Sequence, residues 1–213
     1  MKVYKLTDQN MRTYGDCQWE VGKWKKTSGK GRLCSDGWLH CYSDPLIAVL
    51  LNPINANFNP FRLFIAEAKG RGSHDSGLKS GYKAMRLIKE IEAPSVTETQ
   101  RIAFAILCAK QVYKDARWEA WADKWLSGKD RTANAAYAAA ANANAAYDAA
   151  YDANAATYVA AYAAANAANA AAANANAAYA ANAAYAAANA ADAADAATSK
   201  LDLIAIAKKA LSY

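Results

Sequence analysis

Alanine dominates one long segment of this chain and constrains its fold more than any other feature. Between residues 132 and 198, 42 of 67 positions are alanine, and almost all the others are Asn, Tyr or Asp. The segment contains no Gly, Pro, Lys, Arg or Glu. Because alanine has the highest helix propensity, we expect helix over most of the segment. Reactive side chains are therefore expected among the first 131 residues.

The alanine-rich segment, residues 132–198, is too long for one helix of ordinary size. A straight helix of this length would extend for about 100 Å. We predict two antiparallel helices with a break near residues 169–176, which form a helical hairpin or bundle. Asn and Tyr side chains follow one stripe between Asn144 and Asn169. Since an alanine methyl buries little area, we expect the tyrosines to pack between helices or against the head. The alternative is an exposed ladder of Tyr and Asn that binds a ligand or partner.

The positive charge of the chain lies in its first part. Residues 1–131 contain 22 Lys and Arg against 14 Asp and Glu, whereas residues 132–213 contain three Lys and five Asp. Such a basic head favours anionic partners, among them nucleic acid, nucleotides and acidic protein surfaces. The four cysteines are sparse and the N-terminus has no apolar signal region, so we expect reduced thiols and a cytoplasmic protein. Asn and Asp recur throughout the alanine tract, which argues against a membrane span.

Residues 1–93 are predicted to form a small head, which makes the chain an α+β protein with a mixed, mainly antiparallel sheet. Asp44 and Pro45 suit the N-cap and first turn of a short helix that ends at Leu51. A glycine- and serine-rich stretch, residues 70–81, is predicted to be a flexible connection. In the second strand, three residues would share the buried face: Cys17, Trp19 and Val21. Alternation and short apolar runs predict strands at residues 1–6, 17–24, 37–42, 61–68 and 82–91.

Residues 94–131 change to a helical pattern. Ser95-Val-Thr-Glu98 is a capping-box sequence, and apolar residues follow it at helical spacing. Gly128 suits the end of a second helix. Three tryptophans recur on that helix at spacings of three and four: Trp118, Trp121 and Trp125. We interpret them as packing that anchors the helical region to the head, with an aromatic binding strip as the alternative.

A last amphipathic helix is predicted within residues 199–213. Thr198 and Ser199 would cap it. The residues expected on its buried side are Leu201, Ile204 and Leu211.

A basic loop between Gly22 and Arg32 is the first candidate binding site. Its glycine spacing does not match a phosphate loop, and Gly31 stands where that motif needs Ser or Thr. Basic residues beside an aromatic suit phosphate contact and base stacking, although an exposed hairpin tip has the same composition. The candidate binding residues of this loop are Lys23, Trp24, Lys25, Lys26, Lys30 and Arg32.

The second candidate is the segment from Arg71 to Ser76, which places an imidazole beside a carboxylate and two hydroxyls. Arg71 and His74 join the candidate binding residues, and His74 with Asp75 is the alternative catalytic pair. We interpret the segment as a flexible polar loop and expect no catalytic set in the chain. No metal site is expected either, because no zinc-binding spacing is formed by Cys17, Cys34, His40 and Cys41.

Several pieces of the head resemble an uncharacterised domain of bacteriophages and prophages with the pattern QYEVGK…LC…GFHFC…P, followed by a strand that ends in E-x-x-G. The pieces are Cys17-Gln-Trp-Glu-Val-Gly-Lys23, Leu33-Cys34, Gly37-Trp-Leu-His-Cys41, Asp44-Pro45 and Glu67-Ala-Lys-Gly70. Members of that family often carry an alanine-rich helical extension. The part from about Cys108 to Asp130, which includes Trp118-Glu-Ala-Trp-Ala-Asp-Lys-Trp-Leu-Ser-Gly128, is similar to stretches of alanine-repeat proteins labelled as immunity proteins. The resemblance covers most of residues 1–150 and implies a viral origin.

A more distant resemblance is to small ADP-ribosyltransferases of the rifampin-modifying kind. Lys5 stands where that family has a histidine that holds NAD, and Leu39 or His40 where it has a stacking tyrosine. Asp75 alone corresponds to the acidic residue of the family. The resemblance therefore implies the scaffold without the transferase activity, and a retained pocket that binds a nucleotide without turning it over.

These patterns together predict a non-enzymatic phage accessory protein of the host cytoplasm. It would counter a bacterial defence system by binding a host defence protein, a nucleic acid or a nucleotide signal, and it would need no cofactor. One alternative is an ADP-ribosyltransferase-like enzyme that acts on a host target. The other is a structural protein that forms homo-oligomers through its alanine-rich helices.

Overall fold

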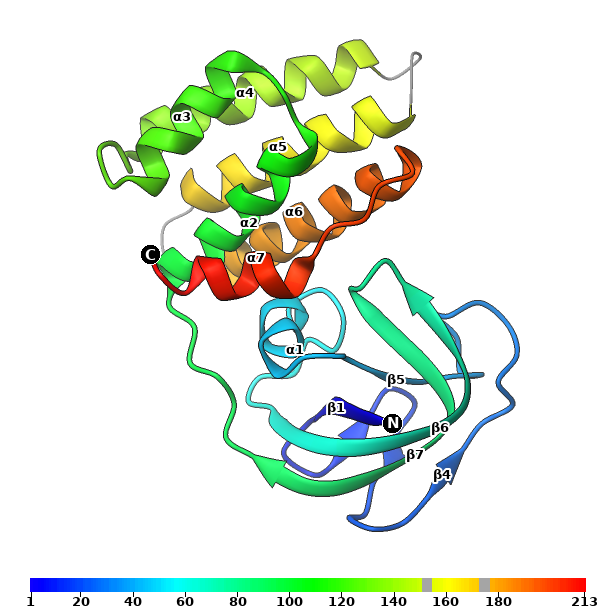
Figure 1. The fold of residues 1–213 in the computed structure, drawn as a ribbon. Coiled ribbons are helices and arrows are strands. Elements are labelled where there is room, and N and C mark those ends of the chain that lie inside the picture. The colour runs from blue at the N-terminus through cyan, green and yellow to red at the C-terminus, as the bar shows by residue number, and fades with distance from the viewer. Residues whose placement is uncertain (151–154, 173–176) are drawn as a thin grey trace. The chain divides into compact units, whose positions relative to one another are not determined.

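The computed structural model describes residues 1–150, 155–172 and 177–213 (Figure 1). It divides into two compact units, unit 1 from Met1 to Ser95 and unit 2 from Val96 to Tyr213. Unit 1 contains an antiparallel β-sheet and unit 2 is helical, so the predicted α+β class is confirmed. Among the described residues, no helix combines the length and apolarity that a membrane crossing requires.

The main sheet of unit 1 has five strands, of which four follow the order β1-β6-β7-β4 while β5 pairs with β7. Two further strands, β2 and β3, form a separate ribbon. The strands are β1 (Lys2–Thr7), β2 (Arg12–Thr13), β3 (Cys17–Gln18), β4 (Lys25–Lys26), β5 (Leu39–Cys41), β6 (Arg62–Asp75) and β7 (Lys79–Ile91). All of the ladders between these strands are antiparallel.

The hairpin of β6 and β7 continues through the residues for which a flexible connection was expected. Pairing extends to Asp75 and Lys79, so the prediction for residues 70–81 was wrong. The register shifts between Lys69 and Gly72, where Gly70 has φ +88°. A bulge of this kind places glycine in a left-handed conformation inside a strand. The glycines therefore bend the hairpin without interrupting it.

One core cluster of unit 1 lies on one face of the sheet, whereas the paired residues Leu6 and Leu63 are buried on the other face. The cluster contains Val3, Phe64 and Leu87 from three strands, and Trp19 from the segment after β3. That segment is irregular, so the strand expected over residues 17–24 forms only at Cys17 and Gln18. Val21 is 52% exposed and only bridges Leu87, because the chain turns away from the core after Trp19.

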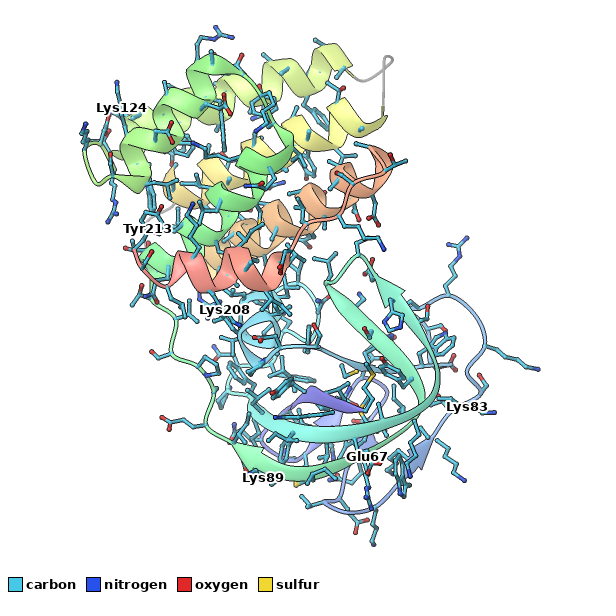
Figure 2. All side chains as sticks on the ribbon, viewed as in Figure 1. Glu67, Lys83, Lys89, Lys124, Lys208 and Tyr213 are labelled. Carbon is cyan, nitrogen blue, oxygen red and sulfur yellow. The ribbon has the colours of Figure 1, made fainter. Side chains whose placement is uncertain are left out.

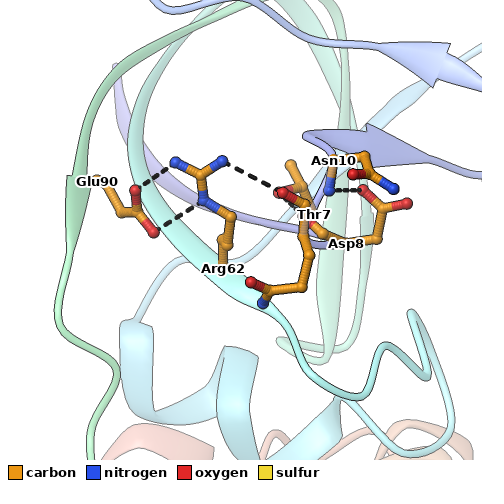
Figure 3. Close-up of polar contacts among 6 residues, drawn as sticks. Thr7, Asp8, Asn10, Arg62 and Glu90 are labelled. Carbon is orange, nitrogen blue, oxygen red and sulfur yellow. Dashed lines mark hydrogen bonds and ion pairs between the residues drawn. The ribbon is translucent and has the colours of Figure 1, made fainter.

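One end of the sheet is fastened by Arg62, the first residue of β6 (Figure 3). Its guanidinium forms two hydrogen bonds with Glu90 of β7, of 3.0 and 2.6 Å. A third bond, of 3.4 Å, reaches the carbonyl of Gln9. The side chain of Asp8 stabilises this turn after β1 by accepting from Asn10 N at 2.9 Å. Arg62 therefore links both neighbours of its own strand.

The short helix α1 (Pro45–Leu51) forms where the sequence predicted it. Asp44 is its N-cap, and its side chain accepts a hydrogen bond from Leu46 N at 2.8 Å. Six of its residues are buried, which explains why a helix of seven residues persists.

Unit 2 begins with α2 (Glu98–Val112), whose capping box is formed by Thr97 and Gln100. The box expected at Ser95 and Glu98 was therefore misplaced by two residues. Every residue from Ile102 to Ala109 is buried, so α2 is surrounded by other elements and is not an amphipathic surface helix. It packs against α5, α6 and α7.

The tryptophan stripe lies on α3 (Ala116–Leu126) and is buried. Trp118 is fully buried and donates through Nε1 to the carbonyl of Ala164 at 3.2 Å. Trp121 and Trp125 are 7% and 3% exposed. The stripe therefore anchors α3 inside unit 2, and an aromatic binding strip is excluded.

The alanine-rich segment forms three helices among its described residues, where we expected two. They are α4 (Ala133–Ala150), α5 (Ala155–Ala172) and α6 (Ala177–Ala196). Helix α5 lies between α4 and α6 and also contacts α2. The expected break near 169–176 falls at the end of α5, partly outside the described residues.

Among the side chains that the structure describes, alanine and not tyrosine forms most of the packing between these helices. Nine alanines of α5 alone are buried. Three described tyrosines, Tyr137, Tyr162 and Tyr185, are 58%, 43% and 50% exposed, so the expectation that they are buried was wrong. Tyr147 contacts Tyr162, with 5.2 Å between ring centroids. Three other tail tyrosines lie outside the described residues or have side chains outside them: Tyr151, Tyr158 and Tyr179.

The last helix, α7 (Leu203–Ala210), is shorter than expected. Asp202 caps it, with its side chain accepting from Ala205 N at 2.9 Å, so the caps predicted at Thr198 and Ser199 were wrong. Its buried residues are Leu203, Ala207 and Ala210, whereas Leu211 is 41% exposed.

Candidate ligand-binding pocket

Unit 1 contains a pocket of about 530 Å³. Ligand sites in proteins commonly have volumes of about 300–1,000 Å³. The pocket is lined by residues of β1, β2, β3, β5 and β7 and of the loops between these strands, so strands that share the core also position its walls. The lining residues used below are Lys5, Tyr14, Cys17, Thr27, Cys34, Asp36, Trp38, His40, Tyr42, Asn55, Phe58 and Lys79.

Lys5 is the buried cation of this pocket. It is two positions after Val3 on β1, so both side chains point to the same face of the sheet, the face of the core cluster. Lys5 is only 8% exposed there. Its ammonium donates to the carbonyl of His40 at 2.7 Å and lies 5.3 Å from the ring centroid of Trp19. No described Asp or Glu forms an ion pair with it. Burial lowers the pKa of Lys5 to about 8, against the raising effect of Cys41 and Cys17.

His40 and Lys79 place two further basic groups in the wall. His40 donates through Nε2 to the carbonyl of Leu33. Burial lowers the pKa of His40, and the charges of Lys5 and Lys79 lower it further, while the bond to Leu33 opposes the shift. Lys79 donates to Asn55 Oδ1 at 3.2 Å and lies 3.9 Å from Asp75. The pocket thus holds two ammonium groups and a neutral imidazole.

Aromatic and hydroxyl groups form the rest of the wall. Trp38, Tyr42, Phe58 and Tyr14 line it, and Tyr14 is 94% exposed at its edge. Burial raises the pKa of the Tyr42 hydroxyl, although a hydrogen bond with Asn55 opposes this. The hydroxyl oxygen of Thr27 is buried and has no hydrogen-bond partner among the described residues. Thr27 itself is one of the residues that line the pocket.

The six residues of the basic loop that the sequence predicted as binding residues do not line this pocket, although Thr27 of the same loop does. Lys25 and Lys26 form β4 and pair with Met85 and Ala84 of β7. Lys23 forms an ion pair of 2.5 Å with Glu20. Trp24 is half-buried under cations of the sheet, and Lys30 and Arg32 are exposed in the loop before β5. The six predicted residues therefore belong to a different surface of unit 1.

The second predicted cluster lies at the turn of the β6–β7 hairpin. Nδ1 of His74 is 2.8 Å from the Ser80 hydroxyl, and the imidazole makes an edge contact with Tyr82. Asp75 faces Lys79, as described above. Arg71 is part of β6, but its side chain lies outside the described residues. His74 and Asp75 do not line the pocket, although Asp75 approaches it through Lys79.

The cysteines are not arranged for metal binding. Among the described residues, no three His, Cys, Asp or Glu side chains gather around a point that a metal ion could occupy. Cys41 is buried, which raises its pKa to about 12, and Cys17 and Cys34 line the pocket. All four cysteines are free thiols, as the sequence predicted.

The binding residues predicted from the sequence did not include Lys5, His40 or Lys79, although the transferase resemblance placed Lys5 and His40 at NAD-contacting positions. One signal was present for Lys5, because it occupies the same alternating face as Val3 and Thr7 in a strand. A lysine on the apolar face of a strand is rarely found without a functional reason or a partner. His40 and Lys79 carry no local signal, since β5 and β7 bring them together from 39 positions apart.

Comparison with known proteins finds one matching family for unit 1, and that family has no assigned activity. Residues 1–99 match the model of a family described as a domain of unknown function (DUF7666). The match includes every strand of the sheet and every residue of the pocket. Neither a curated protein nor a solved structure matches this chain. The residues that line the pocket therefore carry the functional argument.

Proposed function

We propose that unit 1 is a non-enzymatic binding module that takes a small phosphate-bearing ligand of the nucleotide class into its pocket. The observation that carries the proposal is Lys5, a buried cation without a carboxylate partner among the described residues. An unpaired buried charge costs several kcal/mol unless something compensates it. A bound anion would supply that compensation.

The other walls suit a nucleotide. Trp38, Tyr42 and Phe58 offer aromatic surface for a base, and Asp36 and Asn55 offer polar atoms for its edge. Lys79 lies in the same wall as His40 and adds a second ammonium group, whose charge Asp75 partly compensates from 3.9 Å. The unpaired Thr27 hydroxyl is a further donor for a phosphate or ribose oxygen. The volume of about 530 Å³ is that of an ordinary small-molecule site.

The resemblance of the head to a bacteriophage domain suggests that this binding serves the phage during infection of a bacterium. A phage protein with such a pocket would withdraw a nucleotide signal from a bacterial defence system. Expression of the protein in cells that carry defined defences tests this setting. If infection proceeds no better against any nucleotide-signalling defence in the panel, the proposed setting is wrong.

The binding itself is tested by calorimetric titration with ADP and with adenosine. Because a hydrogen bond to a charged group contributes about 1.5–3 kcal/mol, we expect Lys5→Met to weaken ADP binding about 10- to 150-fold. Adenosine, which lacks phosphate, should bind weakly to both proteins. Lys89→Met removes an exposed cation of β7 outside the pocket and should leave the affinity unchanged. Equal affinities of wild type and Lys5→Met for ADP would refute the proposal.

Turnover is tested in the same solutions. Chromatography after incubation should recover ADP unchanged, since the pocket lining contains no paired acid and base. Incubation with labelled NAD and bacterial lysate tests the transferase alternative. Label transfer by the wild type that disappears in Asp75→Ala would mean that the protein is an ADP-ribosyltransferase and not a binding module.

A further inference from the structure

The face of the sheet opposite the core carries a separate set of charged residues. Because neighbouring residues of a strand point to opposite faces, Lys2, Glu67 and Arg86 point away from the core that Val3 and Leu87 enter. We define the outer patch by six residues of this face and its border: Lys2, Trp24, Lys26, Glu67, Lys69 and Arg86. We propose that the outer patch binds single-stranded nucleic acid.

The strand register arranges the charges in two rows across the sheet. In the first row, Lys2 of β1 is opposite Glu67 of β6, which is opposite Arg86 of β7. In the second row, Lys69 of β6 is opposite Ala84 of β7, which is opposite Lys26 of β4. Adjacent strands are about 4.8 Å apart, so the cations spread over the width of the sheet.

The patch has an excess of positive charge. It holds four cations and a single carboxylate, Glu67, which accepts from Arg86 at 2.7 Å and lies 3.6 Å from Lys69. Figure 2 shows Glu67 on the β6–β7 hairpin together with Lys83 and Lys89 of β7. Both of these lysines are exposed and add to the positive field around the patch. Such a field attracts a phosphate backbone.

An aromatic ring lies among these cations. The ammonium of Lys69 is 4.6 Å from the ring centroid of Trp24, and the guanidinium of Arg86 is 5.0 Å from it. The two contacts hold a half-buried indole at the edge of the patch. On the first row, the ammonium of Lys2 lies 5.4 Å from the ring of Tyr4. Aromatic rings between cations are typical of surfaces on which unpaired bases stack while phosphates meet the charges.

The aromatic rings decide between nucleic-acid forms. A base inside a duplex is already stacked and cannot lie on Trp24, whereas a single strand exposes its bases. Phosphate contacts alone would bind a duplex as well as a single strand. The presence of both groups therefore favours the single strand. The pocket of Lys5 takes no part in this interaction, because Lys5 points to the other face.

Fluorescence anisotropy with a labelled twelve-residue oligo-dT tests the proposal on the full chain. For four phosphate contacts, log affinity against log salt should have a slope of about −3. Removing two of them in Lys26→Gln/Lys69→Gln should reduce the slope to about −1.4. Lys124→Gln/Lys208→Gln removes two exposed cations of unit 2 and should leave the slope unchanged.

Trp24→Leu should weaken binding about 5- to 150-fold, as expected for one lost base stack. Its thermal stability must be measured beside its affinity; if it unfolds, the lysine double variant alone decides. Absence of binding at 50 mM salt, or slopes that do not differ between wild type and Lys26→Gln/Lys69→Gln, would overturn the inference. Tighter binding of the matched duplex, or of a poly-glutamate peptide, would also overturn it. Lys5→Met should bind the oligonucleotide like wild type.

Discussion

Lys5 connects stability with function at the scale of a single residue. Its aliphatic chain contributes to the core beside Trp19, but its ammonium is withdrawn from water and paired only with a carbonyl. A group that is retained for binding commonly lowers the stability of the free protein. Replacement of Lys5 by methionine should therefore increase the free energy of unfolding and decrease the affinity for the ligand.

The stability of Lys5→Met should depend on pH in a defined window. The lowering of the pKa of Lys5 from 10.5 to about 8 corresponds to about 3 kcal/mol. The unfolded chain keeps this proton up to pH 10.5, so between pH 8 and 10.5 it binds more protons than the folded chain. The free energy of unfolding of wild type should therefore rise across this window relative to the variant. Below pH 8 the variant should be more stable by up to about 1.5 kcal/mol, because the loss of the charged hydrogen bond to His40, which contributes about 1.5–3 kcal/mol, offsets much of the gain.

Urea unfolding at pH 7 and at pH 10 measures this difference. Lys89→Met, which removes an exposed lysine from the same unit, should show no such dependence. A variant that is less stable than wild type at pH 7 would mean that the bond from Lys5 to His40 outweighs the burial of its charge.

Single residues were predictable from the sequence where their role is local. Asp44 caps α1 and Gly128 follows α3 with φ +76°, because capping depends on neighbours in the chain. The role of Lys5 depends on Trp19 and His40, which only the folded sheet brings to it. Local patterns contain no information about such contacts.

At the scale of elements, the helices of unit 2 are stabilised by the small size of alanine. Helix α5 is enclosed by α2, α4 and α6, and its buried alanines leave no room for larger side chains. Ala167 on α5 is fully buried, whereas Ala141 on α4 is exposed. The same substitution at the two positions separates packing from helix propensity.

Ala167→Leu should lower the free energy of unfolding by about 1–3 kcal/mol, the usual cost of overpacking a close-packed interior. Ala141→Leu should change it by less than about 0.5 kcal/mol, since leucine is also a good helix former. Thermal unfolding monitored by circular dichroism compares the two. Equal effects of the two substitutions would show that the interior of unit 2 is loosely packed.

Elements were predictable where periodicity or composition is strong, and their boundaries were not. Alanine content predicted helix for the tail, but a tract without Gly or Pro contains no signal for where a helix ends, so three helices were taken for two. In unit 1, Gly70 and Gly77 suggested a flexible connection. Strand pairing across the hairpin outweighed the flexibility of these glycines and extended β6 to Asp75.

At the scale of the whole molecule, charge and packing are divided between the two units. Unit 1 contains 15 Lys and Arg against nine Asp and Glu, whereas unit 2 contains ten of each. Both proposed binding surfaces lie in unit 1. The charges of the alanine-rich unit 2 balance, so it has no net positive charge to attract an anionic ligand. Its exposed tyrosines are candidates for contacts between copies of the chain, and light scattering tests whether the protein assembles through this unit.

Because each unit has its own core, a substitution in one should act on the unfolding of that unit alone. In differential scanning calorimetry at pH 7, Lys5→Met should raise the temperature of one transition by about 4–8 °C for each kcal/mol gained. Ala167→Leu should lower the temperature of the other transition and leave the first in place. ADP, if it binds the pocket, should raise only the transition that Lys5→Met moves, because a ligand stabilises the unit that holds it. A single transition that responds to both substitutions would contradict independent unfolding and would make the two units one cooperative structure.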